Sequence, residues 1–239
     1  MQLVIGKDYA DISYLAAEYV KSEILNKSNM VLGLATGSTP LGMYRELIDM
    51  NRKGEISFKD ISSVNLDEYY PLSSQNSQSY HYFMNENFFD HIDIDKGKTH
   101  LLNGEAENAE RECALYEDLI TSLGGIDLQV LGIGRNGHIG FNEPGRELYP
   151  YTHKTALEES TIKANSRFFS SPDEVPRYAL TMGMKTILSA RKIIILASGV
   201  EKREAVRRML SENIDTMCPA TLLSLHNDVT VFVTEDVIK

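Results

Sequence analysis

Short apolar runs alternate along the chain with longer segments whose apolar residues recur every three or four positions. The short runs are typical of buried strands, and the longer segments are typical of helices with one apolar face. This alternation predicts a mostly parallel sheet covered by helices, an α/β fold. Strands are expected at residues 30–34, 62–66, 126–133, 192–197 and 229–233, and helices at 12–24, 40–48, 105–122 and 200–210.

No internal repeat, low-complexity tract or Pro/Gly/Ser linker interrupts the pattern, so residues 1–239 are expected to form a single domain. The stretch 149–176 is different, because it has weak periodicity and many polar residues. It is either a mobile cover over a site or a long surface excursion, and composition does not separate the two.

The charge of the chain limits its partners. A formal net charge of −10 argues against a general electrostatic affinity for nucleic acid or an anionic membrane. A phosphate group could still bind, but only in a local site. The N-terminal residues do not have the pattern of a signal peptide, and no apolar run approaches the ~20 residues that cross a bilayer. These features predict a cytoplasmic protein.

The two cysteines, Cys113 and Cys218, cannot build a disulfide framework, in keeping with a reducing compartment. Cys113 lies at helical spacing from Ala109 and Tyr116, which favours a buried thiol. Cys218 precedes Pro219 in an expected loop, and the sequence leaves its environment open.

The loops that follow strands are the first place to look for a site, because ligands in open α/β sheets bind beyond the carboxyl ends of the strands. The first such loop reads Thr36-Gly37-Ser38-Thr39, before Pro40. Gly37 allows the backbone to come close to a ligand, and a helix start offers unpaired N–H groups. The turn is a candidate phosphate site, but it matches neither the Walker A nor the GxGxxG pattern and also fits an ordinary helix cap.

The segment after the strand at 62–66 carries two adjacent carboxylates, Asp67 and Glu68. Successive side chains leave a strand in opposite directions, so one carboxylate could face a pocket while the other faces solvent or a helix terminus. A carboxylate in a partly dry cleft can have its pKa raised toward neutrality and act as a base. On spacing alone, a solvated acidic loop is the favoured interpretation of the pair.

The richest loop follows the strand at 126–133 and reads GRNGHIGFNEP over residues 134–144. Its glycines indicate backbone conformations or close approaches that side chains would forbid. His138 belongs to the residue type that titrates nearest neutrality, and Glu143 could fix its tautomer, which suits acid–base work on a sugar oxygen. A metal site is the competing chemical interpretation, but these two residues lack a third ligand at a recognisable spacing. A glycine-rich corner with a hydrogen-bonded His is the structural alternative.

Two basic residues could also meet a phosphate. Arg167 stands beside aromatic residues in the segment 149–176, and Lys202 begins the helix expected at 200–210. A lysine at a helix N-terminus is electrostatically misplaced unless an anion joins it, which hints at a ligand. The alternative for each is a surface cation.

At these loops the sequence resembles the glucosamine-6-phosphate deaminase family. The stretches that carry the resemblance follow the family's order and span nearly the whole chain: LATGSTP, NLDEYY, SYHYFMNENFF, LLNG, GIGRNGHIGFNEPG, ANSRFF and PRYALTMG. The resemblance implies a Rossmann-like three-layer α/β/α fold with a mostly parallel sheet, of the type shared with 6-phosphogluconolactonases. It also implies a hydrolase that converts glucosamine 6-phosphate and water to fructose 6-phosphate and ammonia, with no cofactor and no metal.

The resemblance also implies catalytic residues. Asp67 matches the family's general base, which moves a proton between C2 and C1 of the open-chain sugar. His138 matches the group that assists ring opening, with Glu143 orienting it. Asn136 stands where the family often has Asp; it can hold the site by hydrogen bonding but cannot carry negative charge.

The phosphate-binding positions of the family correspond to the turn 36–39, Arg167 and Lys202, and its active-site lid corresponds to 149–176. Longer members are hexamers activated by an amino-sugar phosphate at a subunit interface. This chain is shorter at its C-terminus, and the basic allosteric residues find no match in 145–155. The resemblance therefore predicts a non-allosteric enzyme, either a monomer or a low-order homo-oligomer.

Two other functions compete with this one. A 6-phosphogluconolactonase would share the fold and a glycine-rich His loop, but that loop usually continues toward Ser-Leu-Phe rather than the Phe-Asn-Glu-Pro found here, and a shared fold does not fix function. A sugar-phosphate sensing module without turnover would normally carry a DNA-binding helix-turn-helix, for which this acidic chain leaves no room.

Overall fold

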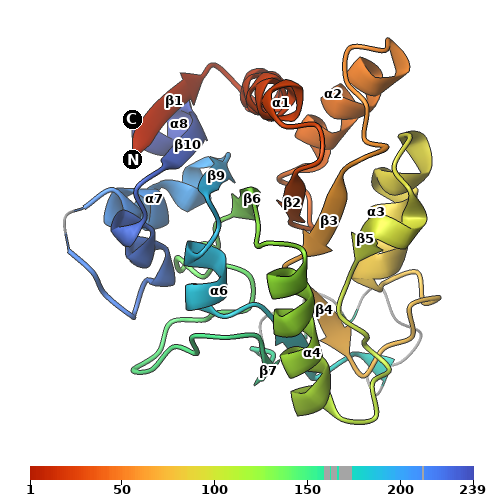
Figure 1. Cartoon of the computed structure of the whole chain (residues 1–239). Coiled ribbons are helices and arrows are strands. Elements are labelled where there is room, and N and C mark those ends of the chain that lie inside the picture. The colour runs from red at the N-terminus through yellow and green to blue at the C-terminus, as the bar shows by residue number, and fades with distance from the viewer. Residues whose placement is uncertain (159–161, 163–165, 167–173, 212) are drawn as a thin grey trace.

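The computed structural model describes residues 1–158, 162, 166, 174–211 and 213–239 (Figure 1). The strands are β1 (Gln2–Gly6), β2 (Val31–Leu34), β3 (Ser62–Asn65), β4 (Asp67–Tyr70), β5 (Thr99–His100), β6 (Leu128–Gly132), β7 (His153–Ala156), β8 (Tyr178–Thr181), β9 (Lys192–Ala197) and β10 (Val229–Thr234). The helices are α1 (Tyr9–Asn26), α2 (Leu41–Arg52), α3 (Tyr80–Asn87), α4 (Ala109–Ser122), α6 (Met184–Leu188), α7 (Arg203–Met209) and α8 (Glu235–Ile238). Short 3₁₀ helices cover Phe89–His91, Lys96–Lys98, Val200–Lys202 and Pro219–Leu225.

Seven of these strands form one sheet in the order β1-β10-β9-β6-β2-β3-β5, with every neighbouring pair parallel. Side chains along the strands alternate between two cores. In β9, Ile193 and Ile195 pack into one core, while Ile194 and Leu196 pack into the other. Residues of α4, α6 and α7 close the first core, and residues of α1, α2 and α3 close the second. The result is the three-layer α/β/α arrangement that the sequence predicts (Figure 1).

All five expected strands are present within two residues of their expected ends. Four are mostly apolar and buried in this sheet, and β3 is buried although it contains Ser63 and Asn65. The expected helices are also present, with corrected boundaries. The helix expected from residue 105 begins only at Ala109, because the side chain of Asn108 caps it by accepting a hydrogen bond from the backbone N–H of Arg111. The helix expected at 200–210 starts with a 3₁₀ turn before α7.

The sequence pattern did not predict the three-stranded antiparallel sheet, whose order is β4-β8-β7. Its strands are short and partly polar, and β4 pairs with a segment more than a hundred residues later in the chain. The strand β7 lies inside the segment 149–176, so part of that segment is regular structure. Much of the remainder, at 159–161, 163–165 and 167–173, lies outside the described residues.

The order of the strands reverses between β2 and β6. From β2 the chain runs outward through β3 and β5, and from β6 it runs the other way through β9 and β10. In open α/β sheets the crevice at such a reversal, beyond the carboxyl ends of the strands, is where ligands bind. The loops that reach it here are 35–40 after β2 and 133–144 after β6, and β3 ends close to Asp67.

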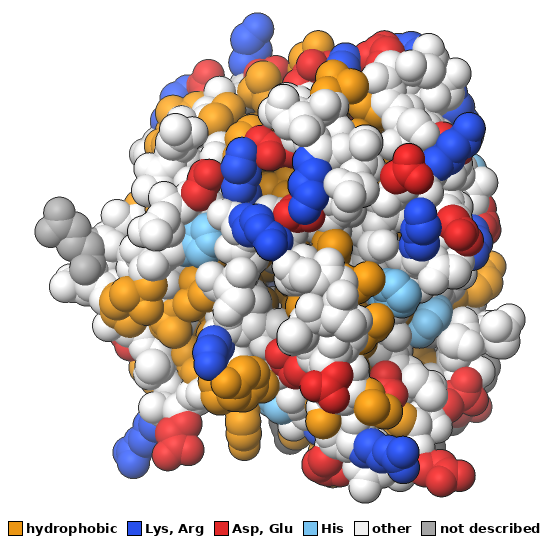
Figure 2. All heavy atoms as spheres, viewed as in Figure 1, with side chains coloured by type: hydrophobic (Ala, Val, Ile, Leu, Met, Phe, Trp, Pro, Cys, Tyr) orange, Lys and Arg blue, Asp and Glu red, His pale blue; other side chains and the backbone are white. Residues whose placement is uncertain are grey.

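The surface agrees with the acidic composition. On the face drawn in Figure 2, basic side chains are interspersed with acidic ones. Within the described residues, the model contains no helix with the length and apolar character needed to span a membrane.

Candidate functional site

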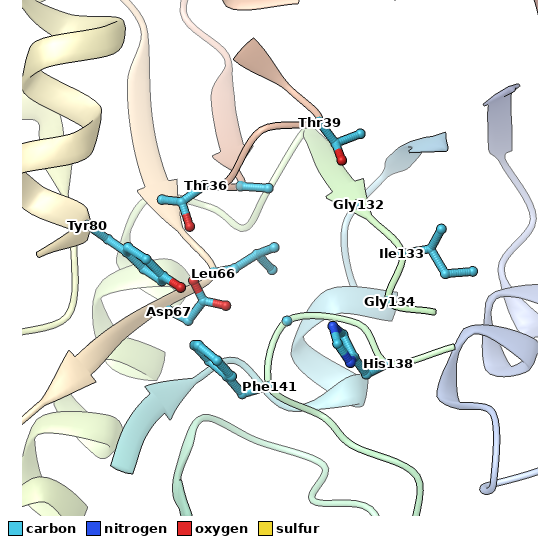
Figure 3. Close-up of a pocket in the computed structure, with 12 residues that line it drawn as sticks. Thr36, Thr39, Leu66, Asp67, Tyr80, Gly132, Ile133, Gly134, His138 and Phe141 are labelled. Carbon is cyan, nitrogen blue, oxygen red and sulfur yellow. The ribbon is translucent and has the colours of Figure 1, made fainter. Parts of the chain in front are cut away.

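A cavity of about 190 Å³ lies at the reversal of the sheet, between the β2 and β6 loops and the start of β4 (Figure 3). Its lining residues are Ala35, Thr36, Thr39, Leu66, Asp67, Tyr80, Gly132, Ile133, Gly134, His138, Gly140 and Phe141. Figure 3 shows Asp67, Tyr80 and Phe141 grouped at one end of this cavity and His138 at the other. The structure therefore brings the two main acid–base candidates of the sequence to one cavity.

Asp67 and Glu68 are not a solvated acidic loop, because both belong to β4 and are only 6% and 1% exposed. Their side chains alternate as strand residues do. Asp67 lines the cavity, while Glu68 turns to the N-terminus of α3. The helix-terminus alternative that the sequence offered for one carboxylate is thus the correct one, and the solvated interpretation is wrong.

Glu68 is tied to α3 by several hydrogen bonds. Its carboxylate accepts the backbone N–H groups of Tyr69, Tyr80 and His81 at 2.9–3.0 Å, and it lies 3.0 Å from Nδ1 of His81. A carboxylate at a helix N-terminus offsets the partial positive charge of the unpaired N–H groups. This anchoring positions Tyr80, whose phenol reaches the cavity beside Asp67.

The environment of Asp67 is dry. Burial, reinforced by the charge of the neighbouring Glu68, raises the pKa of Asp67 to about 8. Desolvation disfavours the charged form of a carboxyl group, so the pKa rises toward the range in which a base works at neutral pH. Asp67 can therefore accept a proton from a weak acid such as a carbon next to a carbonyl group.

His138 belongs to a connected group with Glu143 and Asn136. Nδ1 of His138 lies 3.0 Å from Oε1 of Glu143, and Nδ2 of Asn136 donates a 2.7 Å hydrogen bond to the other carboxylate oxygen. Oδ1 of Asn136 accepts the backbone N–H of His138 at 3.1 Å. Asn136 thus closes the ring of contacts by hydrogen bonding alone, as its side chain allows.

Glu143 is influenced in the opposite direction from Asp67. Its partial burial would raise its pKa, but the hydrogen bonds from His138 and Asn136 and the charge of His138 outweigh that effect and lower the pKa. Glu143 therefore stays a carboxylate at neutral pH. A fixed negative charge beside Nδ1 holds that nitrogen as the one that bears the proton, which leaves Nε2 for exchange with a substrate.

The loop that carries His138 needs its glycines. Gly137 has φ +86°, and a Cβ there would meet the Sγ of Cys218 at 2.3 Å. A Cβ on Gly134 would lie 2.4 Å from the ring of His138. Cys218, whose environment the sequence left open, is therefore a fully buried thiol packed against the His138 loop, and Cys113 is buried as expected.

The Thr36–Thr39 turn meets the cavity only in part. The side chains of Thr36 and Thr39 line it, whereas Gly37, with φ +95°, and Ser38 are exposed. Tyr9 supports the turn from α1, because its hydroxyl lies 2.8 Å and 3.0 Å from the carbonyl oxygens of Ser38 and Thr39. The two threonine hydroxyls could bind an anion or a sugar hydroxyl.

Lys202 lines a second cavity, of about 580 Å³, that shares Gly134 and His138 with the first. Its Nζ donates a 2.7 Å hydrogen bond to the backbone oxygen of Ile133. The Thr36–Thr39 turn and Lys202 thus line neighbouring cavities that meet at Gly134 and His138. The remaining candidate for the phosphate, Arg167, lies outside the described residues.

Tyr80 and Phe141 are cavity residues to which sequence reasoning gave no role. Their rings are parallel within 5°, with centroids 6.3 Å apart, and form an aromatic wall next to Asp67, with the Tyr80 hydroxyl directed toward Asp67 (Figure 3). The sequence signal for Tyr80 is Ser79, which caps α3 and so places the next residue at a helix start. Among the described residues, no three His, Cys, Asp or Glu side chains are grouped as a metal site requires.

Comparisons with known proteins agree with this geometry. The family model of the glucosamine-6-phosphate isomerases/6-phosphogluconolactonases matches residues 9–232. Two proteins named glucosamine-6-phosphate deaminase, from Clostridium perfringens strain 13 and Thermoanaerobacter sp. strain X514, are each 53% identical to this chain. The alignments cover 100% and 99% of this chain and 99% and 93% of those proteins.

Solved structures extend the comparison. A structure described as a monomeric glucosamine-6-phosphate deaminase is 48% identical, with a TM-score of 0.94 over 99% of this chain and 98% of that one. A 6-phosphogluconolactonase from Thermotoga maritima, 21% identical with a TM-score of 0.77 over 98% of each chain, shares the fold. The resemblance noted in the sequence and the expected fold type are confirmed. This chain belongs to the glucosamine-6-phosphate isomerase/6-phosphogluconolactonase family.

Proposed function

We propose that this chain is a glucosamine-6-phosphate deaminase, which converts glucosamine 6-phosphate and water to fructose 6-phosphate and ammonia. Relatives named for this activity match it at 53% identity over its full length. The observation that carries the proposal is the pairing of a dry carboxyl group, Asp67, with the His138–Glu143 pair across one cavity. These are the two kinds of acid–base group that ring opening and isomerisation need.

In the proposed first step, His138 opens the sugar ring. The O1 hydroxyl loses its proton and O5 gains one as the C1–O5 bond breaks, so a single group near neutrality can carry the proton between the two oxygens. Glu143 orients the imidazole and stabilises its charged form, and Asn136 holds Glu143 in place by its hydrogen bond. The product is the open-chain amino aldehyde.

In the second step, the carboxylate form of Asp67 removes the proton from C2 while water donates a proton to O1, which gives an enaminol. Asp67 then returns the proton to C1, and the electron pair of nitrogen forms a C2=N bond. One base can serve both carbons because they are adjacent. The proton released when water adds to C2 in the last step replaces the one that the solvent supplied. The aromatic rings of Tyr80 and Phe141 help to bury Asp67 at this end of the cavity, and the carboxylate fraction of Asp67 grows as the pH rises toward its pKa of about 8.

In the last step, water adds to C2, the C–N bond breaks and nitrogen leaves as ammonia. The phosphate of the substrate, far from the reacting carbons, would be held by Thr36, Gly37, Ser38, Thr39, Arg167 and Lys202. Binding energy from this remote group can position the sugar at Asp67 and His138. The reaction as written balances without a redox cofactor or a metal.

We further propose that residues 1–239 act as one domain, with the segment around 149–176 as an active-site lid. The structure described as monomeric, at 48% identity, supports a monomer, and we propose that this chain lacks allosteric activation because the family's basic allosteric residues find no match in 145–155. A cytoplasmic location is supported by the two buried free cysteines, which suit a reducing compartment.

The test is an assay of purified protein for ammonia and fructose 6-phosphate, with and without N-acetylglucosamine 6-phosphate. We expect stoichiometric formation of both products from glucosamine 6-phosphate, with no activation by the N-acetylated sugar. Hydrolysis of 6-phosphogluconolactone without ammonia release would overturn the proposal in favour of a lactonase. Activation by the N-acetylated sugar would contradict only the non-allosteric part.

A further inference from the structure

The second cavity shares Gly134 and His138 with the catalytic cavity. Its charged lining residues are two cations, Arg135 and Lys202, and two carboxylates, Glu143 and Glu158. A ligand that reaches from Asp67 past His138 would therefore enter the space between these two positive charges. Sequence reasoning considered Lys202 but assigned nothing to Arg135.

The backbone fixes where Arg135 can reach. The N–H of Gly137 donates to the carbonyl oxygen of Gly134 at 3.0 Å, which makes Arg135 and Asn136 the two central residues of a tight turn. The N–H of Gly134 also donates to the carbonyl oxygen of His138 at 2.9 Å. The Cα of Arg135 is therefore held in a constant relation to the imidazole, although its side chain is exposed.

Lys202 is anchored to the same stretch of chain, because its Nζ donates to the carbonyl oxygen of Ile133, two residues before Arg135. That contact uses one of the three N–H groups of the ammonium and leaves two for a ligand. Burial lowers the pKa of Lys202, the charge of Glu201 opposes that effect, and the positive charge of Arg135, the smallest of the three effects, lowers the pKa further. The two cations are therefore close enough to repel each other.

In the part of the chain that the structure describes, neither cation has a carboxylate partner within 4.0 Å. Four of the nine other described arginines have protein partners: Arg191, Arg207 and Arg208 pair with Asp127, Glu204 and Asp215, and Arg203 donates to the backbone oxygen of Asp236. The two oxygens of Glu143 are occupied by His138 and Asn136, and Glu158, the other described carboxylate of this cavity, forms no ion pair with either cation. The charge of the Arg135–Lys202 pair is therefore left for a ligand.

We propose that Arg135 is a substrate-binding residue that, together with Lys202, neutralises the phosphate of the sugar phosphate. A phosphate dianion matches the two positive charges, and the planar guanidinium can contact two of its oxygens while the ammonium acts as a point charge. The identity of the sugar in this inference rests on the proposed function, whereas the binding of a phosphate group by Arg135 does not. Arg135 would add affinity rather than chemistry, because it acts far from the reacting carbons.

The experiment compares Arg135→Ala, Arg135→Lys and Arg135→Glu with the wild-type chain. Arg111→Ala is the matched control, because Arg111 is an exposed arginine on α4 that lines none of the cavities near His138. Two quantities are measured for each protein: the KM for glucosamine 6-phosphate in the ammonia assay, and the Kd for inorganic phosphate by calorimetry.

We expect Arg135→Ala to raise both KM and the phosphate Kd by about threefold to thirtyfold, with a smaller effect on kcat, since one charge-assisted contact at an exposed site is removed. Arg135→Lys should recover part of the loss, because it restores the charge but not the planar fork. Arg135→Glu should bind phosphate more weakly than Arg135→Ala. Arg111→Ala should match the wild type in both quantities.

Unchanged KM and phosphate Kd in both Arg135→Ala and Arg135→Glu would overturn the inference while leaving the proposed function intact. If the wild-type chain released no ammonia, the proposed function would fail, and the phosphate Kd would still decide the role of Arg135. An equal loss in Arg135→Ala and Arg111→Ala would also overturn it, because it would indicate only a change in overall charge.

Discussion

Asp67 and His138 face one cavity but are held in different ways. Asp67 begins β4, is 6% exposed, and is fixed by strand pairing with β8. His138 lies in a glycine-rich loop, its side chain is 35% exposed, and it is held through Glu143 and Asn136. The first group is placed by the fold as a whole, and the second by a local network of side chains.

The carboxyl groups on the two sides show what this difference does. Burial raises the pKa of Asp67, whereas the contacts of Glu143 with His138 and Asn136 overcome its own burial and lower its pKa. Two carboxyl groups whose environments move their pKa values apart can take different parts in one reaction. The comparison therefore assigns proton transfer to Asp67 and the support of a charged imidazole to Glu143.

The largest expected effect is on turnover, when the buried residue Asp67 is replaced. Asp67→Asn keeps the size of the side chain but removes the base, so kcat should fall by about 10²–10⁴-fold. KM should change little, because the phosphate contacts remain. The matched control is Asp118→Asn, an exposed position on α4 that should keep wild-type kinetics. Near-wild-type turnover in Asp67→Asn would remove Asp67 from the reaction.

The same variant should change how stability depends on pH. A carboxyl group whose pKa rises from about 4 to about 8 on folding favours folding while it is protonated, and this contribution disappears as the pH rises through that range. The free energy of unfolding of Asp67→Asn should therefore increase relative to that of the wild type, by several kcal/mol, as the pH rises from 4 to 8. Denaturant unfolding at a series of pH values measures it. Parallel curves would mean that Asp67 is solvated.

A smaller effect is expected on the His138 side. Glu143→Gln removes the negative charge beside Nδ1 of His138 but leaves the imidazole in the cavity, so kcat should fall by about tenfold to a hundredfold. Its stability curve should lack the pH-dependent gain of Asp67→Asn. Glu147→Gln, an exposed change in the following segment, is the control. A fall in kcat in Glu143→Gln as large as that in Asp67→Asn would contradict the different roles assigned to the two carboxyl groups.

The smallest effect is expected at the Thr36–Thr39 turn, which Tyr9 contacts. Tyr9→Phe removes a hydroxyl that contacts the carbonyl oxygens of Ser38 and Thr39, so KM should rise by about twofold to tenfold with kcat nearly constant. Tyr14→Phe on the same helix, where the tyrosine is 48% exposed, is the control. A fall in kcat without a change in KM would show that the turn positions the sugar ring rather than its phosphate.

Five strands of the central sheet were predictable because they are buried and read as short, mostly apolar runs, as at 192–197. The edge strands β1 and β5 were not predicted, because β1 is largely exposed and β5 has only two residues. The antiparallel sheet was not predictable, because β4 contains Asp67 and Glu68 and is stabilised by pairing with a strand that follows more than a hundred residues later. The sequence alone favours solvent for such carboxylates. Only the three-dimensional contacts of Glu68 with the N-terminus of α3 explain its burial.

The candidate site was predictable at the level of its loops but not of its arrangement. The spacing of His138 and Glu143 indicated a pair, and the structure gives that pair. The meeting of Lys202 and Arg135 at one cavity could not be read from the sequence, because it depends on the contact of Lys202 with the β6 loop. The sequence alone does not distinguish Arg135 from an ordinary surface arginine, because only the structure shows its neighbours.

The most direct test of the account is an NMR titration of the Asp67 carboxyl carbon in protein labelled with ¹³C-aspartate, with Asp67→Asn used to assign the signal. Dehydration of Asp67 is the feature on which the assignment of proton transfer depends. The account predicts a midpoint near pH 8. A midpoint near 4, the value of an aspartate in water, would contradict it.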